Sequence, residues 1–215
     1  AGKGDLDAIA NGRTTEGLLG TVRTKFTSGT PHTLVLGGVT NPERFAKNPD
    51  GRSTALKAFT KKHESKPGEK GVNIYTGHFS TDAPAMEFRL EGEQNYSLGT
   101  LHYGDFSETK TIPAGRYEIT MTPRDIALKD TISKEQTFTV DLTERSGEQI
   151  GLLATGFMDP SANNDGPALG YTAISSQGKA LDVTGVNEEE NQIPNKVTLA
   201  QNYPNPFNPS TRIKY

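Results

Sequence analysis

Apolar and polar residues alternate with a period of two in several short stretches of the chain. In residues 86–91, Met86, Phe88 and Leu90 alternate with charged residues. This pattern is typical of a β-strand with one buried face and one wet face. Residues 136–142 alternate in the same way, and residues 149–157 are more uniformly apolar, as expected of a central strand. The pattern therefore predicts a protein built from short strands.

Turn-forming residues separate these stretches. The segment from Ser80 to Pro84 lies between the apolar run 71–75 and the strand at 86–91. Asp82 can accept hydrogen bonds from backbone N–H groups, and Pro84 fixes its own φ angle. We expect a stiff corner here, in which the ring of His78 bonds the local backbone.

The remaining strand signals complete an expected sandwich. They give about seven strands between residues 71 and 183, which suits an immunoglobulin-like β-sandwich. The additional predicted strands, hairpins or loops span residues 96–106, 107–121, 125–131, 169–175 and 179–183.

The first part of the chain matches the middle when it is shifted by 118 positions. Residues 33–42 then align with 151–160, and Ser28-Gly29 aligns with Ser146-Gly147. After a three-residue slip, Ala58-Phe59-Thr60 meets Ala173-Ile174-Ser175. Strands joined by Ser-Gly turns and polar loops are common in β-proteins. However, the same features recur in the same order at a nearly constant offset, which predicts an internal duplication.

The duplication predicts that the first copy is incomplete, because it has no counterpart of residues 71–118. Half a sandwich would expose an apolar face and unpaired strand edges. The missing strands would lie upstream in a longer precursor or come from another chain. The predicted segments are a partial first repeat at 1–65, a linker at 66–70, a complete second repeat at 71–183, an acidic linker at 184–198 and a tail at 199–215.

Composition narrows the possible classes of function. The chain has 215 residues with 32% hydrophobic content, 23 Gly and 13 Pro, which favours strands and turns. A net charge of −3 gives no argument for nucleic-acid binding. No apolar run is long enough to span a membrane, and there is no cysteine. The chain begins at Ala1 without a visible signal peptide, so we expect a processed product or a fragment.

Two motifs resemble one known family of secreted domains. The segment 78–87 is similar to the opening signature His-x-Ser-Pro-Asp-Ala-Pro of a bacterial β-domain family of unknown function, with Thr81 in place of the proline and Glu87 in place of an aspartate. Residues 112–119 match a later hairpin motif of that family. The resemblance covers about residues 71–182. It implies a secreted or surface-exposed β-sandwich and no known reaction.

The tail resembles a second family. Residues 199–215 are similar to the start of the C-terminal sorting domain read by the type IX secretion system. This resemblance implies export to the cell surface or beyond, with the secretion machinery as a partner. The residues that carry it are Asn202, Tyr203, Pro204, Asn205, Pro206, Phe207, Asn208 and Pro209.

Candidate chemistry is sparse. The four histidines lack metal-ligand spacing, with His63 in an apparently solvated linker. There is no nucleophile elbow or phosphate loop. Asp82 and Glu87 could be paired carboxylates, but the pattern favours a turn-forming Asp82 and a strand-face Glu87. Asp159, Asn163 and Asp165 form the best Ca²⁺ candidate in an otherwise ordinary polar loop. We therefore expect no catalytic residue, no cofactor and no firm metal site.

The sequence favours an exported, non-enzymatic structural surface protein. Self-assembly into a filament or layer by strand exchange between subunits is the sharper hypothesis. An adhesion module for polysaccharide would need an aromatic platform drawn from Tyr75, Tyr96, Tyr103 and Tyr171. The non-catalytic portion of a larger secreted enzyme is the third alternative.

Overall fold

A computed structural model describes residues 30–63, 71–124 and 135–186 of the chain. Within these ranges the protein is built almost entirely from strands. The strands are β1 (His32–Gly37), β2 (Lys57–Lys62), β3 (Val72–His78), β4 (Met86–Glu91), β5 (Tyr96–Leu101), β6 (Lys110–Ile112), β7 (Arg116–Pro123), β8 (Gln136–Asp141), β9 (Gln149–Thr155), β10 (Gly170–Ser175), β11 (Ala180–Leu181) and β12 (Val183–Val186). Two short 3-10 helices, η1 (Pro42–Arg44) and η3 (Pro160–Asn163), follow β1 and β9.

Two five-stranded sheets form a β-sandwich, which confirms the all-β sandwich predicted from the alternating pattern. One sheet has the order β12-β8-β7-β4-β5, and the other has the order β11-β10-β9-β3-β6. All the pairs within these sheets are antiparallel except β3 and β9, which run parallel from Asn73↔Gln149 to His78↔Ala154. The sandwich contains more strands than the seven expected. Residues 180–186, for example, form two strands, because β11 joins one sheet and β12 joins the other.

The core lies between the two sheets and follows the alternation of the sequence. Met86, Phe88 and Leu90 of β4 are at most 1% exposed, while Arg89 and Glu91 point to solvent. β9 is apolar on both faces and buried along nearly its whole length, as expected of a central strand. β12 pairs Val183–Val186 with β8, so residues 184–186 belong to the sheet and not to the acidic linker predicted from 184.

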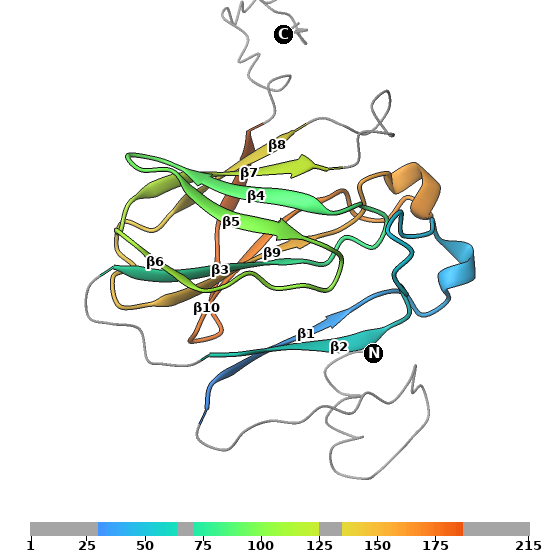
Figure 1. Ribbon diagram of the computed structural model, residues 1–215, viewed down its shortest axis with the longest axis horizontal. Helices are drawn as coiled ribbons and strands as arrows, with labels where there is room; N and C mark the ends of the chain where they lie inside the picture. The colour runs from blue at the N-terminus through green and yellow to red at the C-terminus, as the bar shows by residue number, and fades with distance from the viewer. Residues whose placement is uncertain (1–29, 64–70, 125–134, 187–215) are drawn as a thin grey trace, which may run out of the picture.

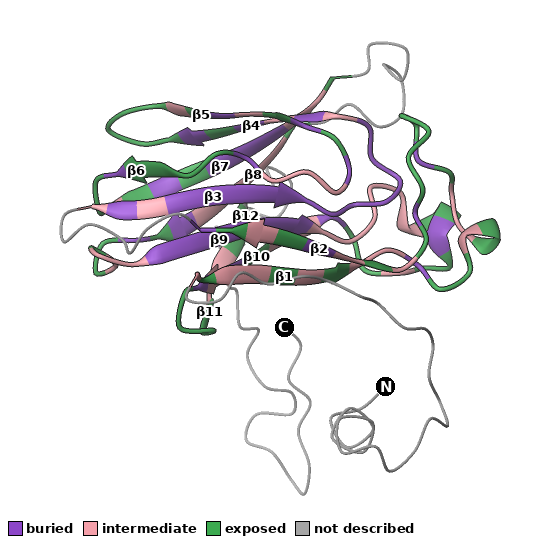
Figure 2. Cartoon of the chain, turned by 60° about the horizontal axis from the view of Figure 1, so that its bottom comes forward, coloured by how far each residue is buried: buried purple, intermediate pink, exposed green. Residues whose placement is uncertain are grey.

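The hairpin of β1 and β2 forms a third layer. Figure 1 shows it below the sheet that contains β3, β9 and β10, and Figure 2 shows the same hairpin from another side. β1 and β2 pair in an antiparallel register from His32↔Lys62 to Gly37↔Lys57. Instead of standing apart as a partial domain, residues 30–63 lie on the outer surface of the sandwich. The middle sheet is consequently covered on both faces.

Candidate functional site

The β1–β2 hairpin and the β9–β10 hairpin have the same construction. In both, a strand leads through a 3-10 helix to an antiparallel partner. The end of β1 and the start of η1 each lie 118 positions before the end of β9 and the start of η3. A parallel bridge closes each unit, Val39↔Ala55 in one and Phe157↔Ala168 in the other. These shared features agree with the duplication inferred from the sequence.

A glycine in the left-handed region follows the first strand of each hairpin. Gly38 has a φ of 104° and Gly156 a φ of 92°. A Cβ at either position would lie 2.6 Å from the carbonyl oxygen of Ala55 or 2.3 Å from that of Ala168. The close approach of the returning chain thus requires glycine at both places.

The structure shifts the second strand of the sequence alignment. Gly37 pairs with Lys57, and Thr155 pairs with Gly170, so Lys57 corresponds to Gly170 and not to the residue two places later. Because the side-chain period of a strand is two, this shift leaves the assignment of inner and outer faces unchanged.

The equivalent faces of the two hairpins have opposite surroundings. Leu34 and Leu36 of β1 are 47% and 64% exposed, and they are the exposed large hydrophobic side chains of the described part of the chain. Their counterparts at the 118-residue offset, Leu152 and Ala154, are fully buried in the sandwich core. A face that forms core in one copy therefore faces solvent in the other.

The strand edges differ in the same way. One edge of β9 pairs with β10 and the other pairs in parallel with β3. Within residues 30–63, 71–124 and 135–186, β1 pairs with β2 alone. An unpaired edge is a template for another strand. The outer face of β1, and its edge away from β2, which has no strand partner within the described residues, together make this hairpin the candidate interaction site.

Aromatic rings anchor the inner face of the hairpin to the sandwich. Phe59 of β2 is 8% exposed and packs edge-on against Phe79 at 5.1 Å and against Tyr103 at 5.6 Å between ring centroids. Tyr75 and Leu153 complete this buried cluster. Burial raises the pKa of Tyr103 to about 12. Because Tyr75 and Tyr103 are buried here, the tyrosines considered for a carbohydrate platform do not form an exposed aromatic surface.

A chain of hydrogen bonds closes the end of this interface. The Gln149 side-chain amide donates to Nδ1 of His63. Nε2 of His63 lies 2.8 Å from the Thr33 hydroxyl, which lies 2.7 Å from the Tyr75 hydroxyl. With Nδ1 as acceptor, a neutral ring carries its proton on Nε2 and donates it to Thr33.

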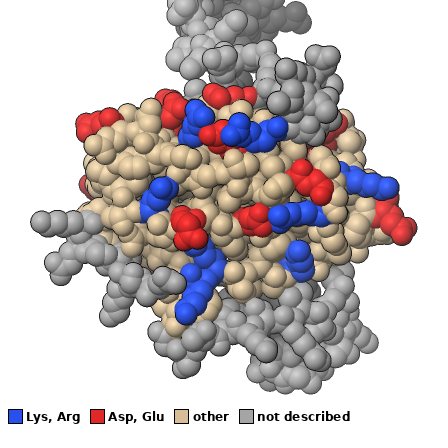
Figure 3. Space-filling view, in the orientation of Figure 1, with Lys and Arg blue, Asp and Glu red and all other residues tan. Residues whose placement is uncertain are grey.

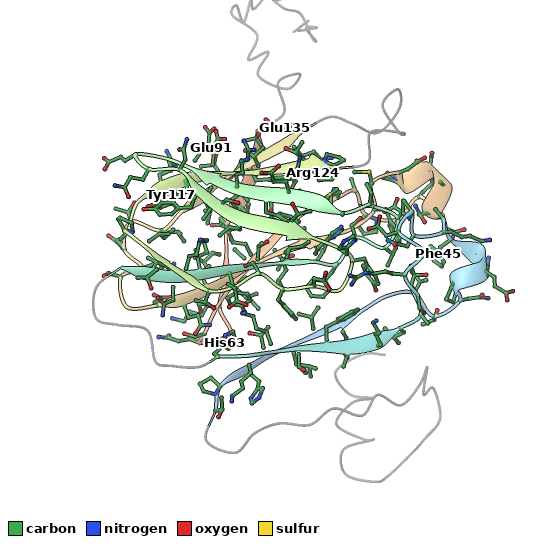
Figure 4. All side chains as sticks on the ribbon, viewed as in Figure 1. Phe45, His63, Glu91, Tyr117, Arg124 and Glu135 are labelled. Carbon is green, nitrogen blue, oxygen red and sulfur yellow. The ribbon has the colours of Figure 1, made fainter. Side chains whose placement is uncertain are left out.

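His63 is thus a buried interface residue, and its assignment to a solvated linker was wrong. It is 7% exposed, and Figure 4 shows it where the hairpin meets the sandwich. Burial lowers the pKa of His63, and the nearby Lys61 and His32 lower it further. Its partner Gln149 is far away in the sequence, so no local pattern marks the contact.

Asp82 holds together the corner predicted around residues 78–84. Its Oδ1 accepts from the Ser80 hydroxyl at 3.0 Å and from the N–H of Met158 at 2.8 Å. Its Oδ2 accepts from the N–H of Asp159 and from the Asn163 amide, both at 2.8 Å. The carboxylate therefore joins this corner to the loop after β9. The local Asx turn predicted from the sequence would have involved only neighbouring residues.

His78 and two asparagines complete the corner. His78 Nε2 lies 2.9 Å from the Pro84 carbonyl oxygen, and burial lowers the pKa of His78. The Asn48 amide donates to the carbonyls of Thr81 and Ala83 at 3.0 Å each. Asn163 Oδ1 accepts from the N–H of Ala46. The loops of both hairpins are thereby tied to one segment.

The three residues predicted as Ca²⁺ candidates have structural roles in the loop after β9. Asp159 accepts from the Ser161 hydroxyl and the N–H of Ala162, which lowers its pKa. Asn163 turns its amide nitrogen toward Asp82, so it presents a donor there. Asp165 lies in the left-handed region with a φ of 53°. The described ranges contain no group of three or more His, Asp or Glu side chains able to hold a metal ion.

The two candidate paired carboxylates, Asp82 and Glu87, lie in different parts of the structure. Glu87 of β4 accepts from Arg89 on the outer face of its sheet and forms an ion pair with Arg124 at 3.3 Å, whereas Asp82 is bonded within the corner. The two do not form a catalytic pair. The sorting motif from Asn202 to Pro209 lies outside the described residues, as do the linker at 66–70 and the predicted strand or loop at 125–131.

The surface charge and the known protein families narrow the possible functions very little. Figure 3 shows acidic and basic groups interspersed on the visible side of the molecule. No helix in the part of the chain that the structure describes is long and apolar enough to cross a membrane. No protein-family model matches the chain, and no curated protein matches it.

Proposed function

We propose that this chain is an exported, non-enzymatic structural protein that self-associates at the cell surface through the outer face of the β1–β2 hairpin. The observation that carries the proposal is the exposure of Leu34 and Leu36 on a face whose counterpart in β9–β10 is buried core. Exposed apolar side chains gathered on one face are typical of interaction sites.

The driving force is the burial of these two side chains by a neighbouring subunit. Full burial of a leucine contributes about 1.5–3 kcal/mol. Because roughly half of each side chain is already covered, Leu34 and Leu36 together contribute about 2–3 kcal/mol. This supports a weak contact that becomes stable when many copies are held together. Strand exchange at the edge of β1 that faces away from β2 would add backbone hydrogen bonds.

Export rests on the resemblance of residues 199–215 to a type IX sorting tail. Fusing residues 187–215 to a reporter in a bacterium that has this secretion system tests it. We expect the reporter at the surface or in the medium. Retention of the reporter inside the cell, in cells that export a known substrate, contradicts this part of the proposal.

Sedimentation velocity of the 215-residue chain over a wide concentration range tests self-association. The weight-average mass should rise above the 23.2 kDa of one chain. The Leu36→Lys variant should remain near that mass, and the matched Thr100→Lys variant, on the exposed side of β5, should behave as the original chain does. Circular dichroism checks that both variants are folded.

Two results would refute this function. One is an original chain that stays monomeric at every concentration. The other is a Leu36→Lys variant that associates as strongly as the original chain, because the contact would then lie elsewhere.

A further inference from the structure

The charge of the hairpin argues against a contact between two identical hairpin faces. On the outer face of the hairpin Lys62 is exposed and no acidic residue is present, whereas Lys57 and Lys61 lie over the rings of Phe59 and Tyr75 on the inner side. A two-fold contact would place the same basic surfaces opposite each other. Like charges across an interface are costly, so an acidic surface fits this hairpin better.

Such a surface lies on the opposite side of the molecule. The outer face of the β12-β8-β7-β4-β5 sheet carries an open hollow of about 810 Å³. Its charged lining consists of four carboxylates and one guanidinium, a formal charge of −3: Glu91, Glu118, Asp141, Asp182 and Arg116. Thr139 and Thr184 add methyl groups to the lining, which suits an apolar ligand edge.

Two of these carboxylates lie directly opposite each other. Glu91 of β4 and Glu118 of β7 are direct cross-strand partners in the ladder. Like charges in this position are destabilising. Neither side chain has an ion pair within residues 30–63, 71–124 and 135–186. An ammonium group from a second molecule would relieve this repulsion.

The positions of the two surfaces determine the symmetry of a contact between them. Figure 1 shows β1 and β2 as the layer on one side of the sandwich and β4, β7 and β8 as the layer on the other. Figure 4 places Glu91 and Tyr117 on that second side. Each copy therefore offers one hairpin face and one hollow, and a contact between unlike surfaces that does not close forms an open chain.

We infer that the outer face of the β1–β2 hairpin of one copy docks against the hollow on the β4–β7–β8 side of the next copy. Lys62, which is exposed on β2, lies against Glu91 and Glu118 in this contact. Leu34 and Leu36 cover the threonine methyl groups. The inference rests on the proposed self-association and specifies a head-to-tail arrangement for it.

Mixing two variants, each with one damaged surface, tests this arrangement. Lys62→Glu reverses the charge of the hairpin face and leaves the hollow intact. Glu118→Lys reverses a charge in the hollow and leaves the hairpin intact. By sedimentation velocity, each variant alone should associate at least tenfold more weakly than the original chain. A 1:1 mixture should regain association, because the intact hairpin of one variant fits the intact hollow of the other and the two reversed charges then face each other with opposite signs.

Matched variants control for the change of charge. Lys110→Glu lies on β6 and Thr100→Lys on β5, both exposed and away from the two surfaces, and both should associate as the original chain does. If Glu118→Lys fails to fold, Glu91→Lys takes its place. Added salt should weaken the association, since the paired charges are at the surface.

The outcomes separate the two proposals. If Lys62→Glu weakens association and neither hollow variant does, the head-to-tail contact is wrong while self-association through the hairpin stands. A closed dimer of the original chain, or a 1:1 mixture that associates no better than either variant alone, also overturns it. If the original chain never associates, both proposals fail.

Discussion

Replacing Asp82 by asparagine changes one atom of the corner and should destabilise the whole protein. Each carboxylate oxygen accepts two hydrogen bonds, and the carboxylate is 8% exposed. In the Asp82→Asn variant one oxygen becomes an NH₂ group, which cannot accept from any of these donors. Whichever way the amide turns, it faces a backbone N–H, either that of Met158 or that of Asp159.

The magnitude follows from the bonds lost. Hydrogen bonds to a charged group contribute about 1.5–3 kcal/mol each. Losing one acceptor site with its two donors should lower the free energy of unfolding by about 3 kcal/mol. With a urea m-value of about 2 kcal/mol/M, the midpoint should fall by about 1.5 M.

Urea unfolding followed by far-ultraviolet circular dichroism measures this change. Asp141→Asn is the matched control, because that carboxylate is exposed and bonds locally to Thr143. It should shift the free energy by less than about 0.5 kcal/mol. If Asp82→Asn unfolds at the same urea concentration as the control, the hydrogen bonds of the Asp82 carboxylate do not stabilise the fold.

Three other predictions test the layers separately. Leu152→Ala should lower the free energy of unfolding by about 2–5 kcal/mol in the same assay. Leu34→Ala, at the equivalent exposed position, should lower it by less than about 1 kcal/mol, and similar losses for the two variants would contradict the difference in burial. Phe59→Ala should speed amide exchange in β1 and β2 at least tenfold and leave β7 unchanged, and equal effects on both would show that the hairpin is not anchored by this ring. Stability should fall as the pH drops below about 6.5, because burial lowers the pKa of both His63 and His78 and the unfolded chain then binds more protons than the folded one. A urea midpoint that is constant from pH 7.5 to 5.5 would contradict this, and His63→Gln should flatten the dependence.

The strands of the core could be predicted from the sequence because their signal is local. Met86, Phe88 and Leu90 alternate with polar residues because they form the buried face of β4. The equivalence of the two hairpins was also visible, since strand, turn and loop recur at nearly constant spacing. The corner at Asp82 was located correctly by residue type, because Asp and Pro have strong local preferences.

Long-range contacts could not be predicted in this way. The partners of Asp82 come from the loop after β9, and His63 meets a glutamine from the start of that strand. His63 sits among lysines, so its neighbourhood resembles a solvated segment. The alternation of apolar and polar residues also does not reveal which sheet a strand joins. For this reason the position of β1 and β2 as an additional layer could not be predicted from the sequence.

At its central strands β3 and β9 the middle sheet has no wet side, since these strands lie between the opposite sheet and the hairpin. β3 and β9 are accordingly buried along nearly their whole length. A protease or a denaturant can reach these strands only after one covering layer has been peeled away. Loss of the small hairpin, which contributes little to the central core, would therefore be enough to open one face of β3 and β9.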